Sequence, residues 1–258
     1  MNIFLTGGSG FLGQSILSHL SKNYTIVAPT SSELDLVNSG KLKEFMKKND
    51  FQYIINCAVR GGRRTRQDTE KDFYTNVKIL DNILEYVSKD RKLITFSSGA
   101  EVYNPNGFYG FSKKICTSLI KDKDYIKNLR IYNLFGELGM KDSFIYTVVG
   151  QCLRNEDIII WDDKLFDICY IDDLIWFIDK LIKINSSEYQ EIDCVYEKKY
   201  KLSEIAYLII SLVNSDSKII IENNNNLNYI GTYSNTLLVT PLETSLKKII
   251  NHIMCNNG

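Results

Sequence analysis

The start of the chain restricts its fold more than any other feature, because a short apolar run leads directly into a glycine-rich loop and then into a helical pattern. The run is Asn2 to Thr6, the loop is Gly7-Gly8-Ser9-Gly10, and the helical pattern covers Phe11 to Leu20. Two glycine registers fit, Gly7-x-x-Gly10-x-x-Gly13 and Gly8-x-Gly10-x-x-Gly13. Glycine lets the backbone approach a pyrophosphate closely, and the helix start presents free N–H groups to the anion. In this context the sequence predicts a dinucleotide-binding loop.

Apolar runs and helical segments alternate through the first half of the chain. The runs that end in turn residues are Asn2 to Thr6, Tyr24 to Ala28, Tyr53 to Cys57 and Leu93 to Phe96. Helical spacing is found in Phe11 to Leu20, in Leu42 to Met46 with its neighbours, and in Phe73 to Val87. Alternating strands and helices predict an α/β fold with a doubly wound parallel sheet, the Rossmann arrangement.

The pattern becomes less regular after Gly136. Helical stretches near Ile145 to Leu153, Leu174 to Ile182, Ile205 to Val213 and Leu246 to Ile253 are there mixed with short strands. A chain of 258 residues suits one large core or a core with a smaller lobe. We therefore predict an NAD(P)-binding domain over residues 1–136 that carries the catalytic residues. Residues 137–258 are predicted to form a smaller α/β, mainly substrate-binding lobe, with some chain returning to the first domain.

Charge and composition exclude several classes of protein. Lys plus Arg and Asp plus Glu are both 31, so no net field attracts the chain to nucleic acid or to an anionic membrane. The longest apolar run, Ile205 to Val213, is too short to span a bilayer. The six cysteines form no C-x-x-C pair, and the two histidines, His19 and His252, fall in terminal helices, so no metal site is expected. The first residues lack a basic region, and a cytoplasmic location is predicted.

The second strand gives the indication of coenzyme preference. An NAD site normally has an acidic residue at the end of this strand to bind the ribose hydroxyls. Here the strand continues into Ala28-Pro29-Thr30-Ser31-Ser32, and the first acidic residue is Glu33. The hydroxyls of Thr30 and Ser31 can donate to a 2′-phosphate, so NADPH is favoured. NADH stays open, because no Arg or Lys stands there.

The catalytic candidates are Tyr109 and Lys113, which share a helix face at a spacing of four residues. The ammonium makes the phenol a usable proton donor near neutral pH. Tyr74 and Lys78 have the same spacing, so context must separate the two pairs. Tyr109 follows a strand that ends in Ser97-Ser98-Gly99-Ala100-Glu101, and the carboxyl ends of such strands face the ligand crevice. Ser98 is thus placed to hydrogen-bond a substrate oxygen.

Motifs along nearly the whole chain resemble one family. They are the glycine loop, Asn56-Cys57-Ala58, Asn76, Ser97-Ser98 with Tyr109-Gly110-Phe111-Ser112-Lys113, Arg130 to Gly136, Cys169 to Leu174, and Thr240 to Glu243. Together they resemble the extended short-chain dehydrogenase/reductases, the NAD(P)-dependent epimerase/dehydratase family of nucleotide-sugar enzymes. Within it, Ser32 to Leu36 and Ala58 to Gly62 are similar to GDP-fucose synthase and related 4-keto-sugar reductases.

The resemblance implies roles for individual residues. Tyr109 donates a proton to a sugar carbonyl, Lys113 binds the nicotinamide ribose, and Ser98 polarises the oxygen. The other residues implied in coenzyme binding are Gly7, Gly10, Phe11, Leu12 and Gly13 at the pyrophosphate, Ala58 along the coenzyme and Tyr132 near the nicotinamide. Asn133 is implied at the sugar nucleotide, and the forked donors of Arg60 suit its diphosphate. The resemblance also implies a homodimer formed through helices Phe73 to Val87 and Tyr109 to Lys121.

Some positions depart from the family pattern. Counting back from Val102-Tyr103 puts Gly99 at the hydroxyl position, whereas counting from the strand favours Ser98. The Tyr103 to Tyr109 connection is short, and Phe166 stands beside Lys164 where many relatives carry an arginine for the diphosphate. The cysteine and histidine with which GDP-fucose synthase epimerises are missing, since Gly99-Ala100 occupies the first position.

These observations lead to one expected function and two alternatives. We expect NADPH-dependent reduction of a nucleotide-linked 4-keto-(6-deoxy) sugar at C4, in the synthesis of deoxysugar or cell-surface glycan precursors. The first alternative is an NAD-dependent epimerase or dehydratase, because Glu101 precedes Val102-Tyr103 as the catalytic base of dehydratases does. The second is a non-catalytic NAD(P)-binding protein.

Overall fold

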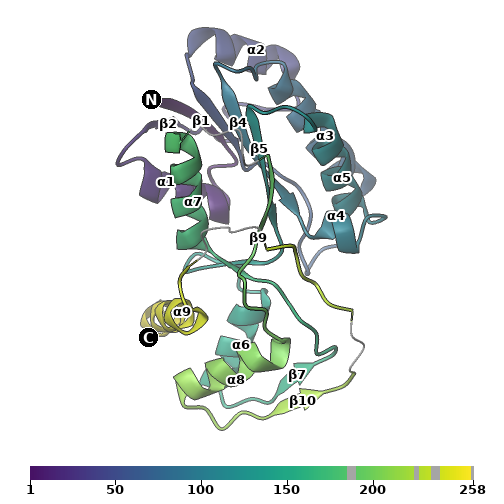
Figure 1. Ribbon diagram of the computed structural model, residues 1–258, viewed down its shortest axis with the longest axis vertical. Coiled ribbons are helices and arrows are strands. Elements are labelled where there is room, and N and C mark those ends of the chain that lie inside the picture. Colours follow the sequence, from purple (N-terminus) through teal and green to yellow (C-terminus); the bar gives the residue numbers. More distant parts are fainter. Residues whose placement is uncertain (185–189, 224–226, 234–238, 257–258) are drawn as a thin grey trace. The chain divides into compact units, whose positions relative to one another are not determined.

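The computed structural model describes residues 1–184, 190–223, 227–233 and 239–256 (Figure 1). The strands are β1 (Asn2–Thr6), β2 (Thr25–Val27), β3 (Tyr53–Asn56), β4 (Lys92–Ser98), β5 (Ile126–Ile131), β6 (Leu134–Phe135), β7 (Ile158–Ile160), β8 (Cys169–Tyr170), β9 (Glu191–Cys194) and β10 (Ile219–Ile221). The helices are α1 (Phe11–Leu20), α2 (Ser39–Lys48), α3 (Glu70–Leu84), α4 (Ala100–Tyr103), α5 (Phe108–Ile120), α6 (Phe144–Leu153), α7 (Ile171–Ile184), α8 (Leu202–Val213) and α9 (Leu242–Asn256). The chain divides into two compact units, residues 1–131 with 175–193 and residues 132–174 with 194–258.

The first unit is built on a six-stranded sheet in the order β2-β1-β3-β4-β5-β9. The pairs β1–β2, β1–β3, β3–β4 and β4–β5 are all parallel. Because β2 and β3 lie on opposite sides of β1, the strand order reverses beside the carboxyl end of β1. This is where open α/β sheets bind their ligands.

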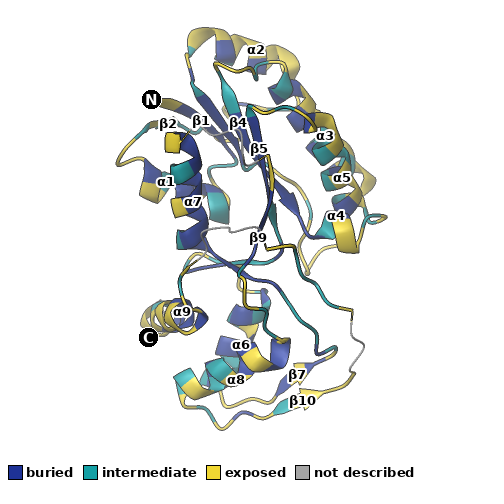
Figure 2. Cartoon of the chain, viewed as in Figure 1, coloured by how far each residue is buried: buried dark blue, intermediate teal, exposed yellow. Residues whose placement is uncertain are grey.

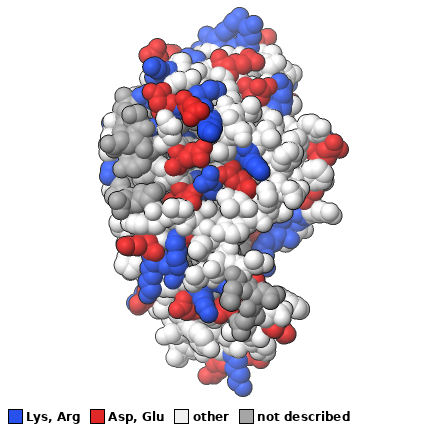
Figure 3. Space-filling view, turned by 45° about the vertical axis from the view of Figure 1, so that its right-hand side comes forward, with Lys and Arg blue, Asp and Glu red and all other residues white. Residues whose placement is uncertain are grey.

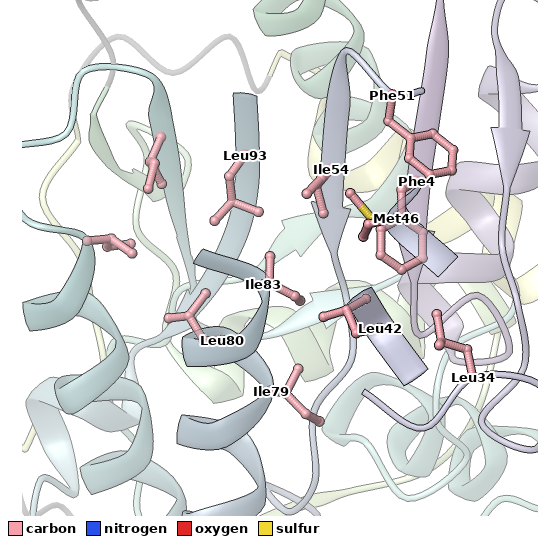
Figure 4. Close-up of a cluster of buried hydrophobic side chains, with 12 residues drawn as sticks. Phe4, Leu34, Leu42, Met46, Phe51, Ile54, Ile79, Leu80, Ile83 and Leu93 are labelled. Carbon is pink, nitrogen blue, oxygen red and sulfur yellow. The ribbon is translucent and has the colours of Figure 1, made fainter. Parts of the chain in front are cut away.

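Helices cover both faces of this sheet, with α2, α3 and α5 on one side and α1 on the other (Figure 1). Neighbouring residues of a strand point to opposite faces, so Phe4 and Ile54 face the α2–α3 side. Figure 4 shows the core there, where Leu42 and Met46 from α2 and Leu80 and Ile83 from α3 surround these strand residues. The strands themselves are mostly buried, whereas the outer sides of the helices are exposed (Figure 2).

The second unit has its own core. Two short parallel sheets, β6 with β8 and β7 with β10, are accompanied by α6, α8 and α9. Ile145 and Val149 of α6 and Ile205 and Ile209 of α8 are fully or almost fully buried. The buried Asp173 accepts hydrogen bonds from the hydroxyls of Tyr196 (2.7 Å) and Thr240 (2.6 Å), which fixes the segment before α9.

The predicted fold class, an α/β fold with a doubly wound parallel sheet, is confirmed, and helix α1 has the predicted bounds. Helix α3 begins at Glu70 rather than near Phe73, because Thr69 and Asp72 form a capping box. Strand β5 was not predicted as a strand. Its sequence, Ile-Lys-Asn-Leu-Arg-Ile, breaks the apolar run with polar side chains, yet Lys127 and Asn128 are buried.

The surface carries both signs of charge, with acidic and basic side chains mixed over the face drawn in Figure 3. Within the described ranges, no helix is long and apolar enough to cross a membrane. The six cysteines are free thiols. In the same ranges, no three His, Cys, Asp or Glu side chains are grouped as metal ligands would be.

Candidate active site

The glycine loop joins β1 to α1 and requires glycine at two positions. Gly7 has a φ of +67°, and a Cβ there would lie 2.6 Å from the carbonyl carbon of Cys57. A Cβ on Gly13 would lie 2.2 Å from the carbonyl oxygen of Gly7. The loop, the first turn of α1 and the end of β3 therefore approach one another more closely than any side chain would permit.

The start of α1 suits an anion. Gly10 is the N-cap residue, no side chain caps the helix, and its first turn contains no acidic residue. The backbone N–H groups of the first turn are thus available to a phosphate, which the helix dipole also favours. Thr6 fixes the surrounding strand ends, because its hydroxyl donates to Asn56 (2.7 Å) and accepts from the N–H of Ala58 (3.2 Å). This cradle fits the pyrophosphate of a dinucleotide.

The turn after β2 differs from the arrangement on which the NADPH prediction was based. The carboxylate of Glu33 accepts hydrogen bonds from the N–H (2.7 Å) and the hydroxyl (2.9 Å) of Thr30. These bonds, the backbone one first, lower the pKa of Glu33. A negative charge therefore lies against Thr30, close after the end of β2. Ser31 is exposed in the same turn.

Ser98 and Lys113 both lie near the carboxyl end of β4, and Lys113 lies over the ring of Tyr109. Lys113 donates from Nζ to the carbonyl oxygen of Phe96 (2.6 Å) and lies 5.7 Å from the centre of the Tyr109 ring. Ser98 is the last residue of β4, and its hydroxyl accepts from the N–H of Ala100 (3.2 Å). Gly99 is the N-cap of α4. Of the two candidates for the hydroxyl position, Ser98 is thus the strand-end residue.

A tight junction of α4 and α5 positions Tyr109. A Cβ on Gly110 would lie 2.1 Å from the carbonyl oxygen of Asn104 and 2.5 Å from that of Ala100. The short connection after Tyr103 therefore depends on glycine beside the tyrosine. The competing pair with the same spacing lies on the surface of α3, where Tyr74 is 61% exposed and Lys78 pairs with Asp81 (3.0 Å).

The loop after β3 is fastened to the helix of Tyr109 through Asn76 of α3. The Asn76 side chain accepts from the N–H of Arg60 (2.7 Å) and donates to the Arg60 carbonyl (2.9 Å). It also donates to the hydroxyl of Ser112 (3.0 Å), which itself donates to the carbonyl of Tyr109 (2.7 Å). The backbone of Arg60 is therefore linked to α5. Arg63 and Arg64 are exposed in this loop, whereas Arg66 pairs with Asp72 (2.9 Å).

Glu101 is buried in a network of hydrogen bonds. It accepts from the hydroxyls of Ser97 (2.6 Å) and Thr117 (2.7 Å) and forms an ion pair with Arg130. Arg130 also pairs with Asp193 of β9. Three donors thus occupy the carboxylate, which joins α4, α5, β4 and β5.

Three further residues that the sequence singled out belong to the second unit. Tyr132 is buried and makes an edge contact with Tyr229 (5.3 Å between ring centres). The Nδ2 of Asn133 is buried and has no hydrogen-bond partner among the residues that the structure describes. Phe166, at the position where an arginine was expected, stacks on Tyr229 (5.5 Å) and lies 6.4 Å from the ring of Phe144.

The first unit thus holds the predicted residues Gly7, Gly10, Phe11, Leu12, Gly13, Thr30, Ser31, Ala58, Arg60, Ser98, Tyr109 and Lys113, and the second holds Tyr132 and Asn133. No sequence pattern predicts that the Glu33 carboxylate bonds Thr30 or that Glu101 is buried and hydrogen-bonded. The adjacent glycines Gly61 and Gly62 are typical of a turn, but no sequence pattern predicts that they lie beside Tyr109.

Comparisons with known proteins identify the family and the fold. A family model described as the NAD dependent epimerase/dehydratase family matches residues 3–192. Among curated proteins, GDP-L-colitose synthase of Yersinia pseudotuberculosis is 34% identical over 104 residues, which make up 38% of this chain and 33% of that protein. The aligned part is therefore about a third of the relative's length.

Solved structures share the fold over almost the full chain. The GDP-mannoheptose C4 reductase of Campylobacter jejuni, solved with NADP bound, has a TM-score of 0.81 at 18% identity, and the match covers 98% of both chains. UDP-glucose 4-epimerase of Thermotoga maritima, solved with UDP-glucose, has a TM-score of 0.81 at 17% identity over 100% of both chains. A reductase and an epimerase are thus equally similar in fold.

Proposed function

Because the chain belongs to the NAD dependent epimerase/dehydratase family, we propose that it reduces the 4-keto group of a nucleotide-linked, 6-deoxy sugar to an alcohol, with NADPH or NADH as coenzyme. The observation that carries this proposal is the placement of Tyr109 and Lys113. Lys113 is anchored on the Phe96 carbonyl near the end of β4 and faces the Tyr109 ring. A cation held beside a phenol at the ligand edge of the sheet is suited to proton donation.

The reaction balances as one hydride and one proton. The reduced nicotinamide, when bound, supplies the hydride, which forms the new C–H bond at C4 of the sugar. Tyr109 gives its phenolic proton to the carbonyl oxygen, which becomes the hydroxyl. Ser98 donates a hydrogen bond to the same oxygen, and the Lys113 ammonium stabilises the phenolate until solvent returns its proton.

The remaining residues bind and orient. The backbone around Gly7, Gly10 and Gly13 would bind the pyrophosphate, to which Phe11 and Leu12 would donate their N–H groups. Ala58 would lie along the coenzyme, and Thr30 and Ser31 would lie at its adenosine ribose. Arg60 of the first unit is proposed for the diphosphate of the sugar nucleotide, and the roles predicted for Tyr132 near the nicotinamide and for Asn133 at the sugar nucleotide belong to the second unit. We therefore assign coenzyme binding to residues 1–136, which also hold the sugar-nucleotide contacts proposed for Arg60 and Asn133, and most of the sugar binding to residues 137–258.

Reduction is favoured over the alternatives by the state of Glu101. A dehydratase needs this carboxylate to remove a proton from the sugar, but it is buried and engaged by Ser97, Thr117 and Arg130. A non-catalytic coenzyme-binding protein would have no need of Lys113 beside the Tyr109 ring. We place the enzyme in the cytoplasm, in the synthesis of deoxysugar or glycan precursors.

The test is the loss of NADPH or NADH absorbance with a panel of 4-keto-6-deoxy sugars linked to GDP, CDP or dTDP. The GDP sugars come first, because GDP stands in the names of the curated relative and of the C4 reductase. Stoichiometric oxidation with one sugar supports the reductase. Conversion of a sugar without net oxidation would contradict it and favour an epimerase or dehydratase.

The variant Tyr109→Phe tests the assigned proton donor. We expect its kcat to fall by roughly 10²- to 10⁴-fold, because general acid catalysis contributes that much. Tyr74→Phe is the matched control, since Tyr74 and Lys78 repeat the spacing of Tyr109 and Lys113 on the surface of α3. Full turnover by Tyr109→Phe would remove Tyr109 from the mechanism.

A further inference from the structure

Two adjacent glycines in the loop after β3 adopt backbone conformations that other residues rarely adopt. Gly61 has a φ of +85° and Gly62 a φ of +71°. A residue with a Cβ is strained at either position. The chain reverses sharply here, between Arg60, which Asn76 holds, and Asp68, which precedes α3.

Gly62 packs directly against the ring of Tyr109. A Cβ on Gly62 would lie 2.8 Å from Cζ, 2.9 Å from Cε1 and 3.0 Å from Cε2 of that ring. These three atoms form the end of the ring that carries the hydroxyl. A Cβ on Gly61 would come only within 3.5 Å of the Tyr109 Cδ2, which is an ordinary contact. The close approach to the reactive end of the phenol thus belongs to Gly62.

The loop is held in this place from both sides. The N–H of Gly62 donates to Asp68 (2.8 Å), and the backbone of Arg60 is bonded at both its N–H and its carbonyl by Asn76. Asn76 also bonds Ser112, which bonds the carbonyl of Tyr109. The loop, through the backbone of Arg60, and Tyr109, through Ser112, are therefore linked to the same side chain of α3, that of Asn76.

We propose that Gly62 is a positioning residue for Tyr109, because the backbone of Gly62 packs against the hydroxyl end of the Tyr109 ring. This contact fixes the phenolic oxygen relative to Ser98 and the Lys113 ammonium. The positioning role of Gly62 rests on the proposed role of Tyr109 as proton donor. A side chain at position 62 would push the ring away. Displacement of a reacting group by about 1 Å costs on the order of 10²-fold in rate.

The first experiment is a double-mutant cycle on thermal unfolding, which needs no substrate. We expect Gly62→Ala to lower Tm clearly in the native background and by less in Tyr109→Ala, where only the backbone strain remains. The difference isolates the ring contact. An equal decrease in Tm on Gly62→Ala in the native and the Tyr109→Ala backgrounds would overturn the proposal.

The second experiment separates positioning from binding. Gly62→Ala is expected to lower kcat by roughly 10- to 100-fold, while the Kd for the coenzyme and the KM for the sugar stay near their native values. A native kcat would overturn the proposal. The cycle can show coupling between Gly62 and Tyr109 while the native protein turns over no sugar. That result would support the contact and contradict the proposed function instead.

A gentler variant covers the case in which Gly62→Ala does not fold. Asp68→Ala removes the acceptor of the Gly62 N–H without adding an atom next to the ring, and we expect kcat to fall with little change in KM. Asp81→Ala is its control, because Asp81 is an exposed acid of α3 that pairs only with Lys78 in the described contacts. Equal kcat values for the two variants would contradict the role of the loop.

Discussion

Glu33 is the residue that opposes the predicted preference for NADPH. Its carboxylate accepts hydrogen bonds from Thr30 just after β2, and these bonds lower its pKa, so it is charged at neutral pH as an ordinary glutamate is. A 2′-phosphate in this turn would be repelled, whereas ribose hydroxyls would donate to the carboxylate. We expect Glu33→Gln to improve the affinity for NADPH relative to NADH by roughly tenfold, by removing a like charge.

Fluorescence titration of the coenzymes alone measures this ratio and does not depend on finding the sugar. The side-chain oxygen of Gln can still accept the hydrogen bonds from Thr30, so the conformation of the turn is preserved. Glu44→Gln, an exposed acid of α2, is the control and should leave the ratio unchanged. If Glu33→Gln also leaves it unchanged, Glu33 has no part in the choice, and Thr30 and Ser31 remain the predicted ligands of a 2′-phosphate.

Helix α3 depends on its first turn. Thr69 and Asp72 form a capping box, and Arg66 pairs with Asp72. The hydrogen bond from Arg66, followed by that from Thr69, lowers the pKa of Asp72 from 3.8 to about 2. Because the pKa of Asp72 is lower in the folded than in the unfolded protein, its charge stabilises the folded state fully above about pH 4. This stabilisation is lost as the pH falls through about 2.

We therefore expect Asp72→Asn to lower Tm at neutral pH, and the difference from the native protein to shrink as the pH falls below 4. Thermal unfolding across this range is the measurement. Asp81→Asn, on the same helix but exposed in its pair with Lys78, should change Tm little. A difference that does not vary with pH would show that the Asp72 charge contributes nothing.

The elements differ in how far sequence alone could predict them. β1, the glycine loop and α1 were predictable, because local spacing and glycine chemistry determine them. β5 was not, since its polar residues are compensated by partners on other elements, such as Thr117 of α5 for the buried Asn128 and Asp193 of β9 for the half-buried Arg130. The contact of Gly62 with Tyr109 was unpredictable for the same reason. It joins a loop after β3 to a helix after β4, and no local pattern records it.

At the scale of the whole molecule, α3 and α5 expose an aromatic surface. Phe73 and Phe111 stack with ring centres 5.0 Å apart, and Phe111 and Tyr74 are 42% and 61% exposed. The family resemblance implies that two copies pack through these helices. We propose a homodimer and expect Tyr74→Glu to weaken it by about 100-fold or more, as substitution of a central aromatic residue does.

Light scattering after size-exclusion chromatography measures the state of assembly at several concentrations. Tyr207→Glu is the matched control, because Tyr207 is also 61% exposed but lies on α8. A native protein that remains monomeric at high concentration would contradict the dimer. A Tyr74→Glu variant that still dimerises would place the interface elsewhere.

The first unit is not a continuous stretch of chain, since it is completed by residues 175–193. During synthesis, a ribosome must therefore make residues 132–174 before the sheet can receive its last strand, β9, and before Arg130 can meet Asp193. Until then the edge of β5 is unpaired, and exposed edges pair readily with other nascent chains. We therefore expect the nascent chain to be prone to aggregation in the interval of translation between β5 and β9.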